Sequence, residues 1–285
     1  MLTKIKTYTP NPLFWELLAG GILLLAALTV LIVNLAMPAP AQPESTVTVS
    51  TEPTGETVSE LVENPLKPAD FAYREDFLTC LTAPAMLGID VSEWQSQVDW
   101  QQVKAAGVEF VIIRAGWRGS ELGVLTRDTL AQSHYAGAKA AGLKVGAYFF
   151  SQAISVEEAQ ADADFLLESI RDWELDMPAV FDWEHISDSY RTAQVDARLL
   201  TDITKAFCDR IAKAGHKPMV YFNEAHSFDR LYLQELAAYD FWLSQYEDKL
   251  SYPYRVDMWQ YTESGNVPGI EGKVDIDLFF PWTNP

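Results

Sequence analysis

An alternation of buried strands and helices, running from Met86 to the end of the chain, most constrains how this sequence can fold. Short aliphatic and aromatic runs predict strands. We expect them over residues 87–91, 110–113, 145–150, 177–185, 218–222, 241–243, 258–260 and 274–279. Repeated strand–helix order implies parallel strands joined by right-handed crossovers. The sequence therefore predicts an α/β fold, a TIM-like barrel of eight strands with a helix-poor last third, of the (β/α)5(β)3 type.

Capping residues mark where the intervening helices begin and end. Asp99 begins a helix that ends at Gly107, and a second helix covers about 128–141 before Gly142. Ser155-Val156-Glu157-Glu158 is a capping box that opens the third helix. A fourth helix carries Val195, Leu199, Ile203 and Phe207 at helical spacing and stops at Gly215.

Three of the predicted strands carry acids in the same phase. Side chains alternate between the two faces of a strand, so Asp182 and Glu184 share one face. By the same alternation Asp90 points away from its aliphatic neighbours, and Asp275 and Asp277 share a face in the last strand. Solvated strand ends in an acidic protein could explain one such pair, but they explain three matching strands poorly. We expect these carboxylates to point into the barrel at its carboxyl-terminal mouth.

Carboxylates crowded into one site raise the pKa of each other, which keeps one acid protonated while its neighbour stays charged. A protonated acid beside a carboxylate is the pair that hydrolysis of a glycosidic bond requires. Asp182 and Glu184 lie about 6.6 Å apart along an extended strand. Because rotamers change this distance, retaining, inverting and substrate-assisted mechanisms all stay open. Oxygen ligands for a divalent cation are a second possibility for the same cluster.

The charge balance excludes several classes of partner. Lys and Arg number 21 against 40 Asp and Glu, for a formal net charge of −19. Nucleic acids and anionic membrane surfaces are bound through basic groups, so neither is an expected partner. The four histidines show no metal-ligand spacing, and we expect no metal and no cofactor. Cys80 and Cys208 could form a disulfide or remain independent thiols.

The first part of the chain predicts attachment to a membrane. Residues 17–37 are apolar enough to span a bilayer as a helix, and Lys4 and Lys6 before them place residues 1–16 in the cytoplasm. Residues 38–68 form a Pro/Ser/Thr/Glu-rich linker, 69–85 a lead-in segment, and 86–285 the extracytoplasmic catalytic domain. The alternative is a signal peptide cleaved after Ala41, which gives a secreted protein.

Separated motifs in the predicted barrel resemble those of the glycoside hydrolase family 25 muramidases, the lysozymes of the Chalaropsis type. They cover about residues 86–282 in the order typical of the family. The motifs are Gly88-Ile89-Asp90-Val91-Ser92-Glu93-Trp94-Gln95, Phe110-Val111-Ile112-Ile113-Arg114-Ala115, Tyr148-Phe149-Phe150-Ser151, Phe181-Asp182-Trp183-Glu184, Met219-Val220-Tyr221, Phe241-Trp242-Leu243-Ser244-Gln245-Tyr246, Trp259-Gln260-Tyr261-Thr262, Gly269-Ile270 and Val274-Asp275-Ile276-Asp277. In the last motif this chain has Asp277 where the family often has Asn.

The resemblance implies hydrolysis of the β-1,4 bond between N-acetylmuramic acid and N-acetylglucosamine in peptidoglycan. Glu184 resembles the general acid of the family, and Asp182 the acid that stabilises the oxocarbenium ion or orients the acetamido group. Asp90 and Asp275 match the supporting acids. The expected substrate-binding residues are Tyr148, Tyr221, Trp242 and Gln260. Core packing explains Tyr148 and Trp242 equally well.

Peptidoglycan glycan strands are therefore the expected partner, the membrane is contacted through the N-terminal helix, and the protein is expected to be a monomer. Two other functions fit the same scaffold. One is a catalytically silent module that binds peptidoglycan, although such a module has little need for both Asp182 and Glu184. The other is a related barrel glycosidase that acts on chitin-like glycans.

Overall fold

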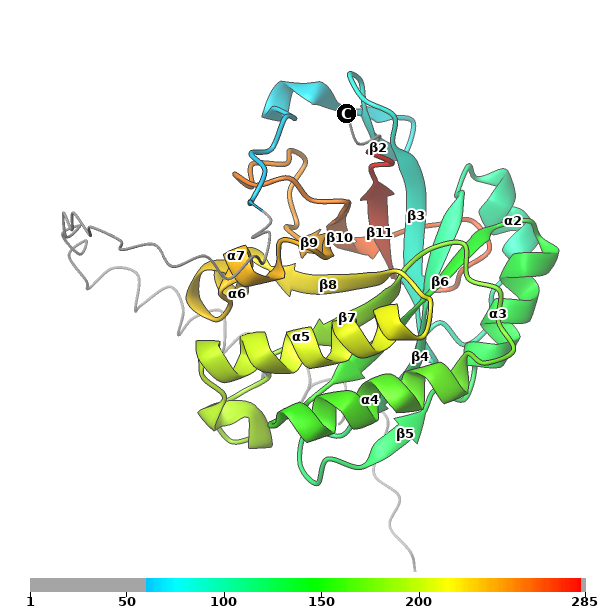
Figure 1. Cartoon of the computed structure of the whole chain (residues 1–285). Coiled ribbons are helices and arrows are strands. Elements are labelled where there is room, and N and C mark those ends of the chain that lie inside the picture. The colour runs from blue at the N-terminus through cyan, green and yellow to red at the C-terminus, as the bar shows by residue number, and fades with distance from the viewer. Residues whose placement is uncertain (1–59, 283–285) are drawn as a thin grey trace, which may run out of the picture. The chain divides into compact units, whose positions relative to one another are not determined.

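The computed structural model describes residues 60–282, and within them eight strands close into a barrel (Figure 1). In chain order these strands are β3 (Met86–Val91), β4 (Phe110–Arg118), β6 (Lys144–Ser151), β7 (Ala179–Trp183), β8 (Pro218–Asn223), β9 (Asp240–Ser244), β10 (Met258–Gly265) and β11 (Val274–Phe279). The barrel closes because β3 pairs with both β4 and β11. The short β5 (Leu125–Arg127) pairs with β4 at its edge. The predicted barrel of eight strands is confirmed.

Helices follow the first five barrel strands, and within residues 60–282 none follows β9, β10 or β11. They are α2 (Trp100–Ala105), α3 (Ala131–Ala140), α4 (Val156–Ser169) and α5 (Ala197–Lys213), with the short α6 (Glu224–Asp229) and α7 (Leu233–Leu236) after β8. The predicted caps are present: Asp99 accepts from two backbone N–H groups of α2, and Ser155 from one of α4. Gly215 ends α5 with φ +88°, a conformation that glycine adopts without strain.

Helix α3 begins three residues later than predicted, because Asp128 is engaged elsewhere. Its carboxylate accepts hydrogen bonds from Arg114 Nε at 2.9 Å and from the backbone N–H of Glu93 at 2.9 Å. It also accepts from the backbone N–H of Leu130 at 3.0 Å. Asp128 thus ties the start of α3 to the ends of β3 and β4 instead of lying inside the helix.

The interior of the barrel below its mouth is filled by a buried apolar cluster. Its members are Phe110, Ile112, Met177, Val180, Met219, Trp242 and Met258. Gly88 of β3 also faces inward, and a Cβ atom there would lie 2.1 Å from the Phe110 ring. The barrel interior is therefore packed with side chains beneath its mouth.

The strands are parallel from β3 to β10, as predicted, but β11 is antiparallel to both β10 and β3. The prediction that all strands run in parallel is wrong for β11. Between β10 and β11 the chain has only residues 266–273, and so short a connection joins antiparallel strands, because a parallel crossover needs a longer one. As a result the start of β11, and not its end, lies at the carboxyl ends of the parallel strands.

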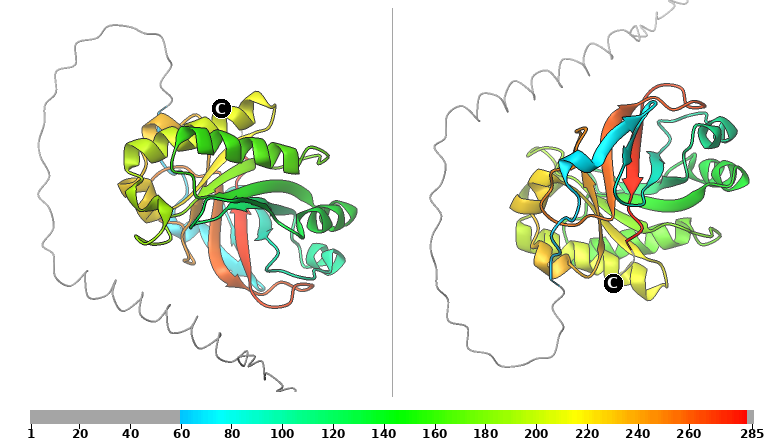
Figure 2. Two further views of the ribbon diagram at one scale, coloured as in Figure 1. Left: turned by 90° about the horizontal axis from the view of Figure 1, so that it is seen from below. Right: turned by 90° about the horizontal axis from the view of Figure 1, so that it is seen from above.

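The lead-in segment before the barrel forms η1 (Pro68–Asp70) and an antiparallel hairpin of β1 (Phe71–Arg74) and β2 (Phe77–Cys80). The Phe71 ring lies edge-on to Trp259 at 5.0 Å and to Phe280 at 6.2 Å. The backbone N–H of Leu78 donates to the Tyr261 hydroxyl at 3.3 Å. Figure 2 shows this hairpin against β10 and β11, on the other side of the barrel from α4 and α5. It covers the outer face of strands that no helix follows.

The predicted linker is too long at its C-terminal end, since residues 60–68 pack on the barrel domain. Val62 O accepts from the backbone N–H of Arg255 at 2.7 Å, and Asn64 N–H donates to Pro253 O at 2.9 Å. Leu66 is buried in the main apolar core. This short segment supplies apolar and hydrogen-bonding groups that a purely solvated linker lacks.

The predicted anchor over 17–37 and the rest of the linker lie outside the described residues. Within residues 60–282 no helix has the length and apolar character needed to cross a membrane. Cys80 on β2 and Cys208 in α5 are both free thiols, so the disulfide alternative is not realised.

Candidate active site

A cavity of about 260 Å³ opens at the mouth of the barrel, above the packed interior, and we call it the mouth cavity. It is lined by Asp90, Tyr148, Phe150, Asp182, Glu184, Tyr221, Trp242, Tyr246, Gln260, Glu263 and Asp275. All eight predicted site residues are among them. The side chains come from seven different strands, β3 and β6 to β11, and from residues just after two of them. The structure therefore brings together in space the acids that the alternation on separate strands pointed to.

The acids of β3 and β11 lie side by side. Asp90 and Asp275 are direct partners in the pairing of these strands, so their side chains meet on the inner face. Gln260 Nε2 donates to Asp90 Oδ2 at 2.8 Å. The Gln260 Oε1 atom in turn accepts from the hydroxyls of Tyr221 and Tyr246, each at 3.1 Å. A continuous hydrogen-bond network thus runs from two tyrosines to a buried carboxyl group.

Burial is the main cause that raises the pKa of four acids in the mouth cavity: Asp90, Asp182, Glu184 and Asp275. The pKa of Asp90 lies well above its usual value, and the charge of Asp275 raises it further. The pKa of Asp182 is also well above normal, through burial and then Glu184, while the Arg114 guanidinium opposes the shift. Several carboxyl groups in one low-dielectric space cannot all ionise at neutral pH.

The pKa values of the other two acids rise for related reasons. The pKa of Asp275 is raised to about 6 by burial and then by the charge of Glu263, while a hydrogen bond with Asp90 opposes the rise. Burial, Asp275 and Glu263 together raise the pKa of Glu184. A proton is therefore retained within this group of acids near neutrality, as acid catalysis requires.

Asp277 does not line the mouth cavity, because the antiparallel direction of β11 carries it deeper into the barrel. It pairs with Gly88, is fully buried, and accepts a hydrogen bond from Trp242 Nε1 at 2.9 Å. Burial and the charge of Asp275 raise its pKa well above normal. Its surroundings thus favour the protonated form of Asp277, and its hydrogen bond fixes the indole that forms part of the cavity wall.

Trp242 belongs both to the packed interior and to the cavity wall, so the two explanations offered by the sequence are compatible. Its ring lies edge-on to Tyr221 with centroids 5.0 Å apart and to Tyr148 at 6.4 Å. All three residues contact the interior cluster and line the mouth cavity. Aromatic walls of this kind provide apolar faces for a sugar ring while the acids supply polar contacts.

The backbone of Glu184 is held by a side chain rather than by the sheet. Strand pairing between β6 and β7 ends at Trp183, whose partner is Ser151. One residue further on, Gln152 Nε2 donates to Glu184 O at 2.8 Å and to Ser151 O at 3.0 Å. Gln152 is fully buried. The end of β6 therefore fixes the position of Glu184 beyond the last strand hydrogen bonds.

A buried ion pair supports the end of β6 from behind. Arg118 Nη2 lies 2.7 Å from Asp162 Oδ1, and the Ser151 hydroxyl donates to Asp162 Oδ2 at 2.6 Å. The Arg118 guanidinium also donates to Gly123 O at 2.7 Å. Removing one partner of such a pair leaves an uncompensated buried charge, so these contacts rigidify the segment that holds Glu184.

Three cavity residues were not singled out from the sequence: Phe150, Tyr246 and Glu263. Phe150 and Tyr246 stand within the motifs that carry the family resemblance, so a signal was present. Glu263 was not predictable from alternation, which places it on the face opposite to Gln260. The pairing of β10 with β11 shifts register between Gln260 and Thr262 and again before Gly265. A bulge redirects side chains, and here it brings Glu263 into the mouth cavity.

Metal binding was the second possibility for the acid cluster. Among residues 60–282, no three His, Cys, Asp or Glu side chains are grouped as the ligands of a metal ion. The expectation that the protein needs no cofactor stays a prediction.

A closed barrel whose carboxylates gather at the carboxyl ends of its strands is the architecture of a barrel glycoside hydrolase. Comparison with known families agrees with this class. The model of Glycosyl hydrolases family 25 matches residues 89–270, and the chain belongs to this family.

Curated relatives include proteins named as lysozymes. The autolytic lysozyme of Clostridium acetobutylicum is 28% identical over 199 residues, which cover 68% of this chain and 56% of that protein. Lysozyme M1 of Streptomyces globisporus is 26% identical over 203 residues, covering 67% of each chain. The matched region thus spans little more than half the length of the clostridial relative.

Solved structures show the same fold. The modular autolysin LytC of Streptococcus pneumoniae matches with a TM-score of 0.60 and 27% identity, over 69% of this chain and 47% of that one. The bacterial lysozyme of Streptomyces coelicolor matches with a TM-score of 0.56 and 26% identity, over 70% of this chain and 93% of that one. The fold is therefore shared with both of these proteins.

The raised pKa of Asp275 predicts how the stability of the fold depends on pH. An acid whose pKa rises from 3.8 to about 6 on folding stabilises the folded state at low pH. This contribution is fully present below pH 3.8 and is lost as the pH rises through 6. Asp275→Asn removes the cost of ionisation. We expect the free energy of unfolding at pH 7.5 to increase by about 1 to 3 kcal/mol, and the gain to vanish near pH 4.

Urea unfolding across this pH range measures the effect. Asp172→Asn is the matched control, since its side chain is 81% exposed and any difference should be small at every pH. A gain that is equally large at pH 4 would contradict the assignment of the raised pKa to Asp275.

Proposed function

We propose that this protein is a muramidase that hydrolyses the β-1,4 bond between N-acetylmuramic acid and N-acetylglucosamine in peptidoglycan. The observation that carries the proposal is the mouth cavity, in which Asp182 and Glu184 lie with two further carboxyl groups of raised pKa. Membership of family 25 and the lysozyme names of the relatives support the choice of substrate.

Glu184 is the general acid in this proposal. It lies just beyond the end of β7, at the opening of the cavity, where the oxygen of a bound glycosidic link can reach it. Burial and the charges of Asp275 and Glu263 raise its pKa, which favours the protonated form that a general acid needs. It donates that proton to the leaving oxygen as the glycosidic bond breaks.

Asp182 acts from deeper in the cavity. Its Oδ1 atom is buried and has no hydrogen-bond partner among the residues that the structure describes. A buried acceptor without a partner is costly in the empty site, and a substrate N–H would relieve that cost. We assign to this atom the N–H of the acetamido group beside the bond that breaks, and to the Asp182 carboxylate the stabilisation of the developing positive charge.

Asp90 and Asp275 support the pair. The charge of Asp275 raises the pKa of both Asp182 and Glu184, and Gln260 fixes Asp90 in place. Tyr148, Tyr221 and Trp242 form the apolar walls against which a sugar ring is positioned. Orientation of the substrate by such walls lowers the entropic cost of reaching the transition state.

Release of muropeptides from purified peptidoglycan tests the proposal. We expect Glu184→Gln to lower kcat by at least about 10³-fold, because the amide cannot donate the proton, and Asp182→Asn by about 10²-fold. Mass spectrometry of the products should find muramic acid at the new reducing ends. Exposed Glu247→Gln serves as the control and should retain full activity.

Two outcomes would contradict the proposal. Absence of release from several kinds of cell wall by the unmodified protein would favour a catalytically silent module that binds peptidoglycan. Cleavage of chitin oligomers without cleavage of peptidoglycan would favour a glycosidase of another specificity.

Gln152 is a positioning residue for the same reaction. Gln152→Leu removes the hydrogen bond to Glu184 O. We expect kcat to fall about 10- to 100-fold with KM within about twofold, since small displacements of a reacting group are costly. A Glu184 that moves toward solvent has a lower pKa, so the alkaline limb of the kcat profile should shift to lower pH.

The exposed Gln101→Leu on α2 is the matched control for this variant, and thermal unfolding verifies that both variants fold. An unchanged pH profile with an unchanged kcat would show that the sheet alone positions Glu184.

We also propose that a helix over residues 17–37 anchors the protein in a membrane, with residues 1–16 cytoplasmic and the barrel outside the cell. The apolar run, in which Thr29 and Asn34 are the only polar residues, and the lysines before it support this. Full-length protein with an intact N-terminus should be found in the membrane fraction. A mature form that begins at Gln42 would instead establish cleavage of a signal peptide.

A further inference from the structure

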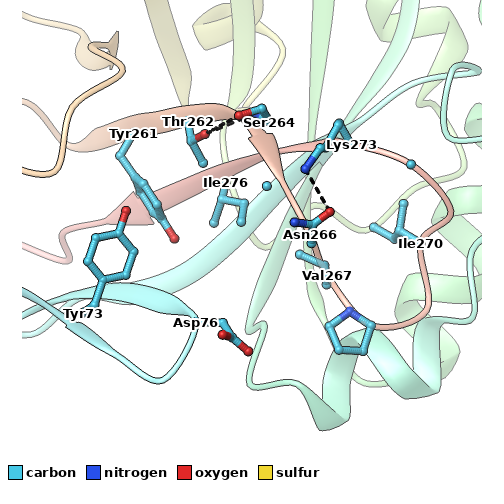
Figure 3. A pocket seen from close by; sticks show the side chains of 13 residues that line it. Tyr73, Asp76, Tyr261, Thr262, Ser264, Asn266, Val267, Ile270, Lys273 and Ile276 are labelled. Carbon is cyan, nitrogen blue, oxygen red and sulfur yellow. Dashed lines mark hydrogen bonds between the residues drawn. The ribbon is translucent and has the colours of Figure 1, made fainter.

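A second cavity of about 740 Å³ lies against the β10–β11 hairpin, on the face turned away from the barrel interior (Figure 3). We call it the outer groove. One wall comes from the β1–β2 hairpin through Tyr73 and Asp76, and the other from β10, β11 and the loop between them. The outer groove is nearly three times as large as the mouth cavity.

The two cavities share the β10–β11 hairpin as a wall. Asp275 lines the mouth cavity, whereas its neighbour Ile276 lines the outer groove. Likewise Glu263 faces the mouth cavity between Thr262 and Ser264, which face the outer groove. Successive side chains of a strand point to opposite faces, so only the thickness of one strand pair separates the cavities. A chain that crosses the rim of this hairpin passes from one cavity into the other.

The size of the mouth cavity requires part of the substrate to lie elsewhere. At about 260 Å³ it is smaller than the 300–1,000 Å³ typical of sites for small molecules, and it suits about one sugar unit. In peptidoglycan the muramic acid carries a stem peptide on its lactyl group. Each extended residue spans at most about 3.6 Å, so about three residues suffice to cross the rim of the hairpin.

The outer groove has the chemistry of a site for such a peptide. Its floor includes the buried side chains of Ile276 and Val267, which suit small apolar groups. Asp76 presents an exposed carboxylate from the β1–β2 turn, and Lys273 presents an ammonium group, 3.0 Å from Asn266 Oδ1, from the opposite wall. Tyr73, which is 51% exposed, lies at one end of the groove. Opposite charges on facing walls complement a peptide that carries both an amine and carboxylates.

We propose that the outer groove binds the stem peptide of peptidoglycan, so that the enzyme prefers glycan strands that carry peptides. The inference rests on the proposed muramidase function. Tyr73 and Asp76 lie outside residues 89–270, so this wall of the groove does not follow from the family match. In this arrangement the β1–β2 hairpin both covers the barrel and completes a specificity site.

Kinetics on two substrates test the inference with the full-length chain. One substrate is uncrosslinked glycan strands with their stem peptides, and the other is the same strands after an amidase has removed the peptides. We expect kcat/KM to be at least about tenfold higher on the peptide-bearing strands, mainly through KM. The double variant Asp76→Ala/Lys273→Ala should lose most of this preference, since each charged contact contributes severalfold to affinity.

Hydrolysis of the stripped strands by the double variant should stay within about twofold of the unmodified protein. Lys249→Ala, which removes an exposed lysine outside the groove, should leave kcat/KM unchanged on both substrates. Equilibrium binding of both kinds of strand to Glu184→Gln, with and without the groove substitutions, provides a readout that does not depend on turnover.

If the double variant lost kcat/KM equally on both substrates, the inference would be overturned, because the groove would then contact the glycan. No loss on either substrate would also overturn it. Hydrolysis of stripped strands leaves the proposed function standing in both cases. If the unmodified protein cleaves neither substrate, the proposed function fails, and the binding measurements alone decide whether the groove recognises the peptide.

Discussion

The crowding of carboxyl groups at the mouth of the barrel is the constraint on which the rest of this structure depends. Asp90, Asp182, Glu184 and Asp275 share a small, largely buried space, and the cost of ionising each of them is raised by a neighbouring carboxylate. Such an arrangement lowers the stability of the folded protein at neutral pH. A scaffold must therefore hold these groups together against their repulsion, and a closed barrel with a packed interior does so.

Three features of the scaffold serve this purpose. Strand pairing places Asp90 beside Asp275, and a chain of hydrogen bonds through Gln260 stabilises Asp90. Gln152 holds the backbone of Glu184 where the sheet no longer can. The buried Asp277 fixes the Trp242 indole beneath the acids. In each case a side chain makes a hydrogen bond to a distant segment of the barrel, which rigidifies the site.

The helix-poor side of the barrel shows how one segment meets two needs. Strands β10 and β11 lack helices over their outer face, which would expose large aromatic side chains to water. The β1–β2 hairpin covers part of this face through Phe71 and Leu78. Because it stands off from the β10–β11 loop, it also leaves the outer groove beside the mouth cavity.

The sequence by itself determined the order of strands and helices and the inward phase of Asp90, Asp182 and Asp275, because both follow from local periodicity. Resemblance to family motifs added the tyrosines, Trp242 and Gln260. Tertiary structure alone decided the extension of β10 to Gly265, which leaves only a short connection to an antiparallel β11, the bulge that brings in Glu263, and the support of Glu184 by Gln152. These features depend on contacts between residues distant in the chain or on a local break in alternation, and no periodic pattern encodes either one.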